Sequence, residues 1–397
     1  MIRKNSHNLL YFVFVYWHDD LFKKKVGGPI KVFELTKYLN SLGNQVYLFI
    51  PKIGYPERQT TAKVFSVPFI DLPILRFVSY QIIAFFWALR LAFSENFPDV
   101  IYVRIMWSFI PMILGRILAV PIILEINDSP HRAYTSVNNN FKKFVIRVID
   151  KISFYLSDHV LPVTKKIAIN MHRLEGIPWK KITVLPSGAN TEIFFPMDKR
   201  KCCLELGFDQ SLTYIGFVGT IFHYQGIDIL IEAAPMIIRN YPNVRFLIVG
   251  DGPMKNTLEN MVIEKSLQSY FIFTGYIPYE CVPSYCAVMT ICVAPFHRSA
   301  GDSSPVKVFD YLACGKPVVV SDVGENGVFF KNSGAVVLVP PEDPAILAQG
   351  VNRLLTKEAL HGEMGRNGRE FIVRNYSRRK NAEVIVTVAS KILASRV

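Results

Sequence analysis

The sequence predicts an α/β protein with two doubly wound domains, each built around a parallel sheet. Short apolar runs alternate with helical stretches along the whole chain, a pattern typical of parallel strands that helices cover on both faces. The runs fall into two series, one for each domain. The first series comprises residues 9–16, 45–50, 100–103, 120–126, 159–163 and 182–185. The second comprises residues 213–218, 244–249, 271–273, 290–294, 317–321 and 335–339.

Length and composition indicate where the domains divide. A chain of 397 residues is long enough for two or three domains. A polar segment near residue 196 follows a turn at residues 187–190, which predicts an N-terminal domain at 1–195 and a second domain at 196–375. The basic stretch 376–397 is expected to form a helix that packs back toward the first domain. Because ligands of open parallel sheets bind beyond the carboxyl ends of the strands, we expect the site there.

The charge is uneven along the chain. The net charge is +13, and residues 1–195 hold 24 Lys and Arg against 13 Asp and Glu. A basic half favours an anionic small molecule or an anionic membrane surface as partner, and simple solubility is the plain alternative. Nucleic acid is the rival anionic partner, but we find no nucleic-acid-binding motif and expect no such partner.

The cysteines and the apolar segments indicate the cellular compartment of the protein and whether it crosses a membrane. The six cysteines form no Cys-x-x-Cys pair and no zinc-like cluster with histidine, so we expect reduced thiols, no metal site and a cytoplasmic protein. Residues 77–93 are interpreted as a core helix or an interfacial helix, since they are short for a membrane span. Residues 107–126 are interpreted as a helix followed by a strand. The apolar run near the N-terminus is expected to be a buried strand, because no cleavage site follows it.

The most informative segment is residues 301–322. Asp302 and Asp310 are separated by seven residues, and Ser304 between them predicts the N-cap of a helix whose first residue is a proline. The amides of Val306 and Lys307 would then be free at a positive helix end that can bind phosphate or hydroxyls. This layout suits a ligand with a diphosphate and many hydroxyls, such as a nucleotide sugar. The alternative is an ordinary capped helix followed by a buried strand.

Glycine turns after predicted strands are further candidates for phosphate binding, because glycine lets the backbone approach a ligand closely. None of them completes a dinucleotide fingerprint or a P-loop, and each can also be a plain turn. The candidate binding residues in and beside these turns are Gly27, Gly28, Gly219, Thr220, Gln225, Gly275, Tyr276 and Ile277.

Polar residues that follow two buried strands are candidates for acid–base chemistry. Glu125, Asp128 and His131 end the run 120–126 or follow it, and any of them could act as a base or hydrogen-bond a sugar. His131 can equally be an ordinary loop residue. His297 follows the run 290–294 and could assist a sugar hydroxyl or be a surface histidine.

These motifs resemble those of retaining glycosyltransferases of the GT-B fold, family 4 type, also called glycosyl transferases group 1. Family members have an acidic residue, seven others and a second acidic residue, here Asp302 and Asp310 where glutamate is usual. Residues 304–319 are similar to the Ser-Pro-x-Lys subgroup, and matches at residues 27–28, 42–46, 217–219, 249–253 and 273–276 extend the resemblance over nearly the whole chain. It implies two Rossmann-like domains facing across a cleft, with the acceptor on the first and a nucleotide sugar on the second.

The resemblance also implies individual roles. Asp310 would bind ribose hydroxyls, while Asp302 and the amides after Ser303 would hold the sugar. Residues 219–220 would lie by the diphosphate, residues 275–277 would meet the base, and residues 27–28 would approach the donor phosphates and the acceptor.

The chain departs from the family where cations are expected. Many relatives have a basic residue where Thr220 stands and a lysine where Gln225 stands. The leaving diphosphate still needs positive charge, and no metal motif supplies it. We therefore expect Lys307 and the helix N-terminus to provide it, with Arg298 assisting.

Together these observations lead us to expect a metal-independent retaining glycosyltransferase that uses a nucleotide diphosphate sugar and no cofactor. Its acceptor would be a hydroxyl of a glycan or lipid-linked saccharide in surface polysaccharide synthesis. The family implies a cytoplasmic protein, peripheral on the inner face of the membrane. A nucleotide-sugar epimerase of similar fold and a non-catalytic membrane-associated subunit of a glycan assembly complex are the alternatives.

Overall fold

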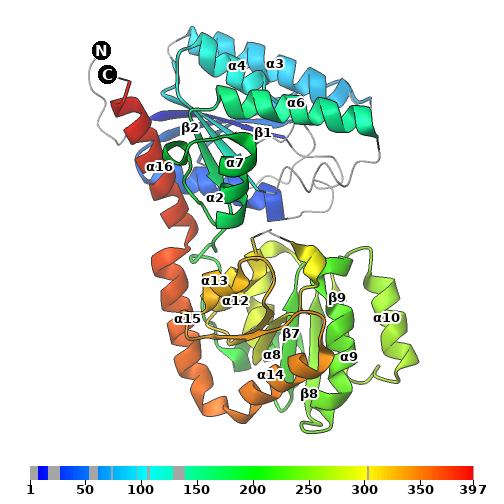
Figure 1. Cartoon of the computed structure of the whole chain (residues 1–397). Helices are drawn as coiled ribbons and strands as arrows, with labels where there is room; N and C mark the ends of the chain where they lie inside the picture. Colours follow the sequence, from blue (N-terminus) through cyan, green and yellow to red (C-terminus); the bar gives the residue numbers. More distant parts are fainter. Residues whose placement is uncertain are drawn as a thin grey trace. The chain divides into compact units, whose positions relative to one another are not determined.

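The computed structural model describes residues 8–16, 27–52, 61–72, 75–94, 96–104, 108–127, 139–301 and 304–396, without the side chains of 27–29. Contacts divide the chain into two compact units (Figure 1). The first comprises Met1–Pro186 and Arg378–Val397, and the second comprises Ser187–Ser377. Residues 187–195, which the sequence assigns to the first domain, therefore group with the second unit.

The described part of the first unit contains a six-stranded parallel sheet in the order β3-β2-β1-β4-β5-β6. Its strands are β1 (Leu10–Val15), β2 (Gln45–Pro51), β3 (Lys63–Val67), β4 (Val100–Arg104), β5 (Ile122–Ile126) and β6 (His159–Pro162). Its helices are α2 (Gly27–Ser41), α3 (Leu75–Ala92), α4 (Ile110–Ile117), α6 (Asn140–Leu156), α7 (Lys165–Glu175) and α16 (Arg378–Ala394).

Both faces of this sheet are covered, because successive side chains of a strand point to opposite sides. On β1, Tyr11 and Val13 enter a core with α2 and α16. Phe12 and Phe14 enter a second core with α3 and α4. Helix α16 is fixed at its start, where Arg378 Nε lies 2.9 Å from Glu34 Oε2 of α2.

The second unit repeats this architecture with the strand order β12-β11-β10-β7-β8-β9. Its strands are β7 (Thr213–Val218), β8 (Val244–Val249), β9 (Phe271–Gly275), β10 (Ile291–Ala294), β11 (Val318–Ser321) and β12 (Val336–Val339). One face packs against α8 (Lys199–Leu206), α11 (Val282–Val288), α12 (Val306–Ala313) and α15 (His361–Asn375). The other face packs against α9 (Ile227–Ile238), α10 (Lys255–Glu264) and α14 (Pro344–Thr356). The prediction of two doubly wound, Rossmann-like sheets is confirmed.

In the first unit two local predictions are wrong and one strand is missed. Residues 182–185 form no strand; Ile182 makes only an isolated bridge to Val160, beside the short edge strand β6. The edge strand β3 is missed, because its sequence Lys-Val-Phe-Ser-Val is short and half polar. Gly27 and Gly28 do not form a turn before a helix, since they are the first residues of α2 itself.

Candidate active site

The carboxyl edge of the second sheet is built from interlocking glycine turns. Gly219 follows β7 and donates its amide to Val249 of β8 at 2.9 Å, and Gly250 donates to Gly275 at the end of β9 at 3.0 Å. Gly219 and Gly250 have φ values of +142° and +135°, which side-chain-bearing residues rarely adopt. A Cβ on Gly250 would overlap the carbonyl oxygen of Gly219. The edge therefore presents closely packed backbone where ligands of parallel sheets bind.

Lys307 brings a cation to this edge. It lies in the first turn of α12 and donates from Nζ to Gln225 Oε1. The same Nζ is 3.6 Å from the centroid of the Phe217 ring and 3.1 Å from where a Cβ would stand on Gly219. Burial lowers the pKa of Lys307 well below its ordinary value, because the ammonium is desolvated. Three of the predicted binding residues, Gly219, Gln225 and Lys307, thus lie together.

The start of α12 differs from the prediction. The helix begins at Val306, with Pro305 at the N-cap position and no side-chain cap, so Ser304 is not the cap. Its hydroxyl oxygen accepts from the amide of Ser187 at 3.3 Å instead. The Val306 amide, which was expected to be free, donates to the carbonyl of Ser304 at 2.9 Å. Local turn geometry and a partner distant in sequence thus replace the predicted cap.

Other predicted donor residues of the second unit that the structure describes also lie toward this edge. Asp310 is half-buried one turn after Lys307, and the adjacent Tyr311 hydroxyl accepts from the amide of Val218 at 2.6 Å, which joins α12 to the end of β7. Half-buried Thr220 follows Gly219 directly. Tyr276 and Ile277 follow β9, two strands along the sheet from β7. Asp302 and Ser303 lie outside the described residues.

In the first unit, Glu125 is the centre of a buried charge cluster. Its side chain has no exposed surface, and Oε1 accepts from Lys31 Nζ of α2 at 2.6 Å. Tyr102 donates to its other oxygen, and Arg104 Nε lies 3.5 Å away. Burial raises the pKa of Glu125, but the charges of Lys31 and Arg104, with the hydrogen bonds from Lys31 and Tyr102, together outweigh burial and bring it to about 2.

This environment favours a positioning role over a base for Glu125, because a carboxylate so strongly stabilised is a poor proton acceptor. Sequence reasoning missed Lys31, Tyr102 and Arg104. The one available signal was that Lys31 stands a turn after the glycine pair 27–28. Asp128 and His131 lie outside the described residues.

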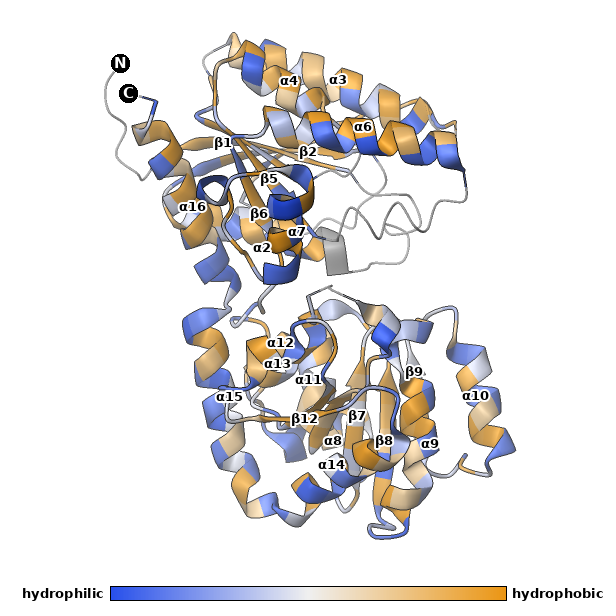
Figure 2. Ribbon diagram, in the orientation of Figure 1, coloured by the Kyte–Doolittle hydropathy of each residue, from blue (hydrophilic) through white to orange (hydrophobic). Residues whose placement is uncertain are grey.

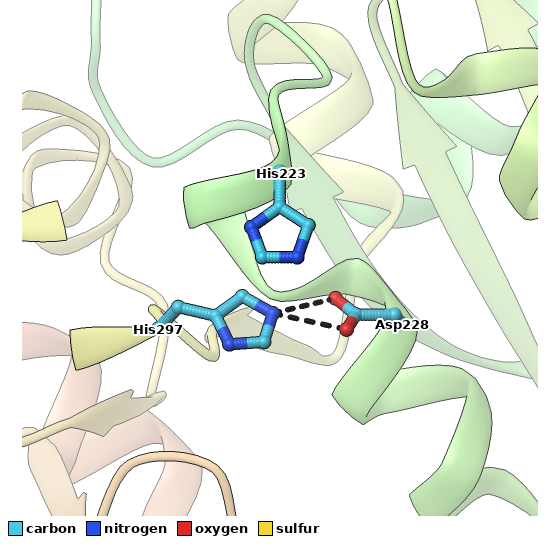
Figure 3. A group of neighbouring side chains, drawn as sticks. All are labelled: His223, Asp228 and His297. Atoms are coloured by element: carbon cyan, nitrogen blue, oxygen red, sulfur yellow. Dashed lines mark hydrogen bonds and ion pairs between the residues drawn. The ribbon is translucent and has the colours of Figure 1, made fainter. Parts of the chain in front are cut away.

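His223, Asp228 and His297 lie together, with ligand-type atoms all within 4.8 Å of one another (Figure 3). His297 Nε2 lies 2.9 Å from an oxygen of Asp228, and its Nδ1 lies 3.3 Å from Glu342 Oε1. The two imidazole rings are stacked, with centroids 4.5 Å apart and planes 9° from parallel. A metal ion must lie close to the plane of each imidazole that binds it, and stacked rings share no such point. In this arrangement Asp228 and Glu342 hold His297 at the loop after β10, and His223 stacks on its ring.

His297 and Arg298 are both fixed by Glu342. Besides the histidine contact, Glu342 accepts from the Arg298 amide at 3.0 Å and from its Nε at 3.1 Å. The guanidinium predicted to assist the diphosphate is thus engaged by a carboxylate, and most of its side chain is exposed.

Comparison with known proteins identifies the family. Residues 204–371 match the family described as glycosyl transferases group 1, and residues 27–193 match glycosyltransferase family 4. The chain is 25% identical over 281 residues to an alpha-D-kanosaminyltransferase of Streptomyces kanamyceticus, covering 68% of this chain and 70% of the relative. It is 22% identical over 338 residues to the alpha-monoglucosyldiacylglycerol synthase of Acholeplasma laidlawii, covering 78% and 83%.

Solved structures share the fold over nearly the whole chain. A sucrose-phosphate synthase from Thermosynechococcus elongatus superposes with a TM-score of 0.76 at 18% identity, covering 98% of this chain and 100% of that one. HepE of Anabaena in complex with UDP-glucose superposes with a TM-score of 0.72 at 15% identity, covering 97% and 100%. Since glycosyltransferase families match both halves and the fold is shared with such enzymes, the chain belongs to the group 1 glycosyltransferases of the GT-B fold.

Proposed function

We propose that this glycosyltransferase moves a sugar from a nucleotide diphosphate sugar, bound at the carboxyl edge of the second sheet, to a hydroxyl of a glycan or lipid-linked saccharide. The observation that carries the proposal is the Lys307 ammonium, which lies beside Gly219 and Gln225 at that edge. The UDP-glucose complex of HepE, which has the same fold, supports a nucleoside diphosphate as the donor's leaving group.

Lys307 compensates for the lysine that many relatives have at the position of Gln225. Its Nζ donates to Oε1 at the end of the Gln225 side chain. The ammonium of Lys307 therefore lies next to the position at which those relatives have a lysine side chain. The ammonium at the start of α12 thus meets the side chain of Gln225, which lies just before α9. A diphosphate bound there would meet one ammonium without a metal ion.

The reaction would use this charge as the donor breaks. The bond between the anomeric carbon and the phosphate oxygen breaks, and the acceptor oxygen bonds to the same face of that carbon. The acceptor proton passes to the departing diphosphate. Negative charge grows on the diphosphate during this step, and a cation held in place beforehand stabilises it without reorganisation. Because the apo ammonium has a lowered pKa, diphosphate binding would draw a proton onto Lys307.

Other parts of the proposal rest on the family. Retention is supported by relatives whose names denote alpha-linked products, namely an alpha-D-kanosaminyltransferase and an alpha-monoglucosyldiacylglycerol synthase. The latter name denotes a lipid product, which supports a lipid-linked acceptor. The cytoplasmic location on the inner membrane face and the part in surface polysaccharide synthesis are proposed from the family resemblance alone. We assign the ribose to Asp310, the base to residues 275–277, the sugar to Asp302 and Ser303, and no cofactor beyond the donor.

Calorimetric titration with UDP, GDP and dTDP tests the donor site. Lys307→Met is expected to weaken the preferred nucleoside diphosphate by about 10-fold to 100-fold, the effect of losing a hydrogen bond to a charged group. The double variant Lys307→Met/Gln225→Lys should recover binding, because it restores a cation at the same edge. Lys357→Met, which removes an exposed lysine beyond the end of α14, should bind like the parent protein.

Proton linkage gives a second readout. Titration in two buffers of different ionisation enthalpy should show more proton uptake on binding by the parent protein than by Lys307→Met, because the bound diphosphate raises the lowered pKa of Lys307. Unchanged nucleotide affinity in both Lys307→Met and Asp310→Asn would contradict the site. If the donor alone is isomerised without an acceptor, the protein is an epimerase instead.

A further inference from the structure

The outward side of α6 is apolar, which is the reverse of an ordinary surface helix. Six large apolar residues recur there at helical spacing, each at least 36% exposed: Phe141, Phe144, Val145, Val148, Ile152 and Tyr155. The side that faces the unit instead has the buried polar residues Asp150 and Ser153. Ser153 donates from its hydroxyl to the Ser108 carbonyl at 2.8 Å, so this orientation is fixed by a specific contact.

Two neighbouring helices extend the apolar surface. Figure 2 shows α3, α4 and α6 side by side along one face of the first unit, and contacts join α4 to each of the other two. Helix α3 exposes a stripe that includes Phe86, 60% exposed, and α4 exposes Ile117, 57% exposed. We call the exposed apolar residues of the three helices the outer face: Leu75, Val78, Ile82, Phe86, Trp87, Ile113 and Ile117, with the six of α6.

Basic residues outnumber acidic ones around this face, although Arg76 of α3 pairs with Asp71 and Arg116 of α4 pairs with Asp158. The three helices contain seven lysines and arginines and one acidic residue, Asp150, which is buried. On α6 the cations Lys142, Arg147 and Lys151 are exposed beside the apolar stripe. Exposed aromatic and aliphatic residues flanked by cations suit the boundary between the headgroups and acyl chains of an anionic bilayer.

Helix α3 has a length and hydropathy sufficient to cross a membrane, yet its contacts hold it on the sheet. The Tyr80 hydroxyl donates to the carbonyls of Val15 and Phe49 at 2.8 and 2.9 Å, and Ala84 and Ala88 are fully buried. Crossing the bilayer would break these contacts, whereas lying on its surface keeps them. A second copy of the chain is a poorer occupant, because two strongly basic faces would repel each other.

We propose that the outer face of α3, α4 and α6 binds an anionic membrane surface, with the apolar stripe of α6 entering the headgroup region and its cations contacting anionic headgroups. The proposal stands on the first unit alone and does not depend on the donor site of the second. If both hold, the enzyme would work on acceptors presented at that surface.

Flotation of the full chain with lipid vesicles tests the proposal. The protein is expected to bind phosphatidylglycerol–phosphatidylcholine vesicles at low salt and to bind phosphatidylcholine vesicles weakly. Phe141→Ser/Phe144→Ser should reduce binding by at least about 10-fold, because two inserted aromatic side chains are lost. Lys142→Gln/Arg147→Gln/Lys151→Gln should also reduce it and should flatten its dependence on salt. Leu204→Ser, which removes an exposed leucine of α8, is the matched control and should bind like the parent.

Thermal unfolding of every variant checks that these exposed substitutions leave the fold intact. Absence of binding to anionic vesicles by the parent protein would overturn the proposal. Vesicle binding by the α6 variants that equals that of the parent protein would also overturn the proposal. Concentration-dependent dimerisation abolished by Phe141→Ser/Phe144→Ser, without vesicle binding, would assign the outer face to a second copy of the chain instead. Nucleotide titration of the same variants should be unaffected, which separates this outcome from a failure of the donor site.

Discussion

At the scale of single residues, the buried charges around Glu125 depend on one another. Glu125, Lys31 and Tyr102 are removed from water together, and each charge persists only because its partner remains. Burial lowers the pKa of Lys31 to about 8, with Glu125 acting in the opposite direction. The cluster joins α2 to the carboxyl ends of β4 and β5 and so positions the start of α2, where Gly27 and Gly28 stand.

Glu125→Gln is expected to destabilise the first unit by about 3 kcal/mol, because it leaves the buried ammonium of Lys31 without a counter-charge. The double variant Lys31→Met/Glu125→Gln should recover part of this loss, since both charges are then absent. Urea unfolding followed by circular dichroism measures the difference. A double variant less stable than Glu125→Gln alone would contradict the ion-pair account.

The same residue sets a pH dependence. The pKa of Glu125 is about 2 in the folded protein and lies below its unfolded value, so its stabilisation is complete above about pH 4.5 and is lost as pH falls toward 2. The stability difference between the parent protein and Glu125→Gln should therefore narrow over that interval. A stability difference that does not change with pH would show that the charge of the Glu125 carboxylate does not stabilise the folded protein.

At the scale of elements, the carboxyl edge of the second sheet depends on glycine turns that pack too closely for a side chain between them. The turns after β7 and β8 touch through Gly219 and Gly250, and Tyr311 of α12 holds the end of β7 through Val218. The position of Lys307 follows from this packing, because α12 is anchored one turn further on by the tyrosine.

Gly250→Ala is expected to cost about 3 kcal/mol, since it combines a disfavoured φ with an overlap on the Gly219 carbonyl. It should also weaken nucleoside diphosphate binding. The control is Gly207→Ala at the end of α8, where φ is +73° and nothing lies within 4 Å of the added Cβ. That variant should cost about 1 kcal/mol from backbone strain alone and leave binding unchanged. Chemical denaturation measures the stability of each variant, and calorimetry measures its nucleoside diphosphate binding. Equal effects of both substitutions would refute the close contact between Gly250 and the Gly219 carbonyl.

At the scale of the whole molecule, each unit has its own sheet and its own two cores, and the chain returns to the first unit at Arg378. Ile385 of α16 is fully buried against α2, while Ile372 of α15 is fully buried in the second unit. Two consecutive C-terminal helices thus stabilise different units.

Hydrogen exchange of the full chain tests this division. Ile385→Ala should lower protection of β1 and α2 by about 3 kcal/mol, the usual effect of a large core deletion. Ile372→Ala should have the corresponding effect on α12 and the strands beside it. Each variant serves as the control for the other, and equal loss of protection in both units from either one would mean that they unfold together.

The sequence by itself determined the architecture and the segments where chemistry can occur. Apolar periodicity and turn residues are local properties, so eleven of the twelve predicted strands and the loops that follow them were found from neighbouring residues alone. The tertiary structure decided the partners. Lys307 meets Gln225 across 82 positions, because β7 and β10, which precede them, are neighbours in the sheet. Ser304 meets Ser187 across 117 positions. The tertiary structure also decided which side of α6 faces solvent. Periodicity reveals an apolar stripe on this helix, but only packing shows that the stripe is exposed. The polar side faces the unit because Ser153 donates a hydrogen bond to Ser108.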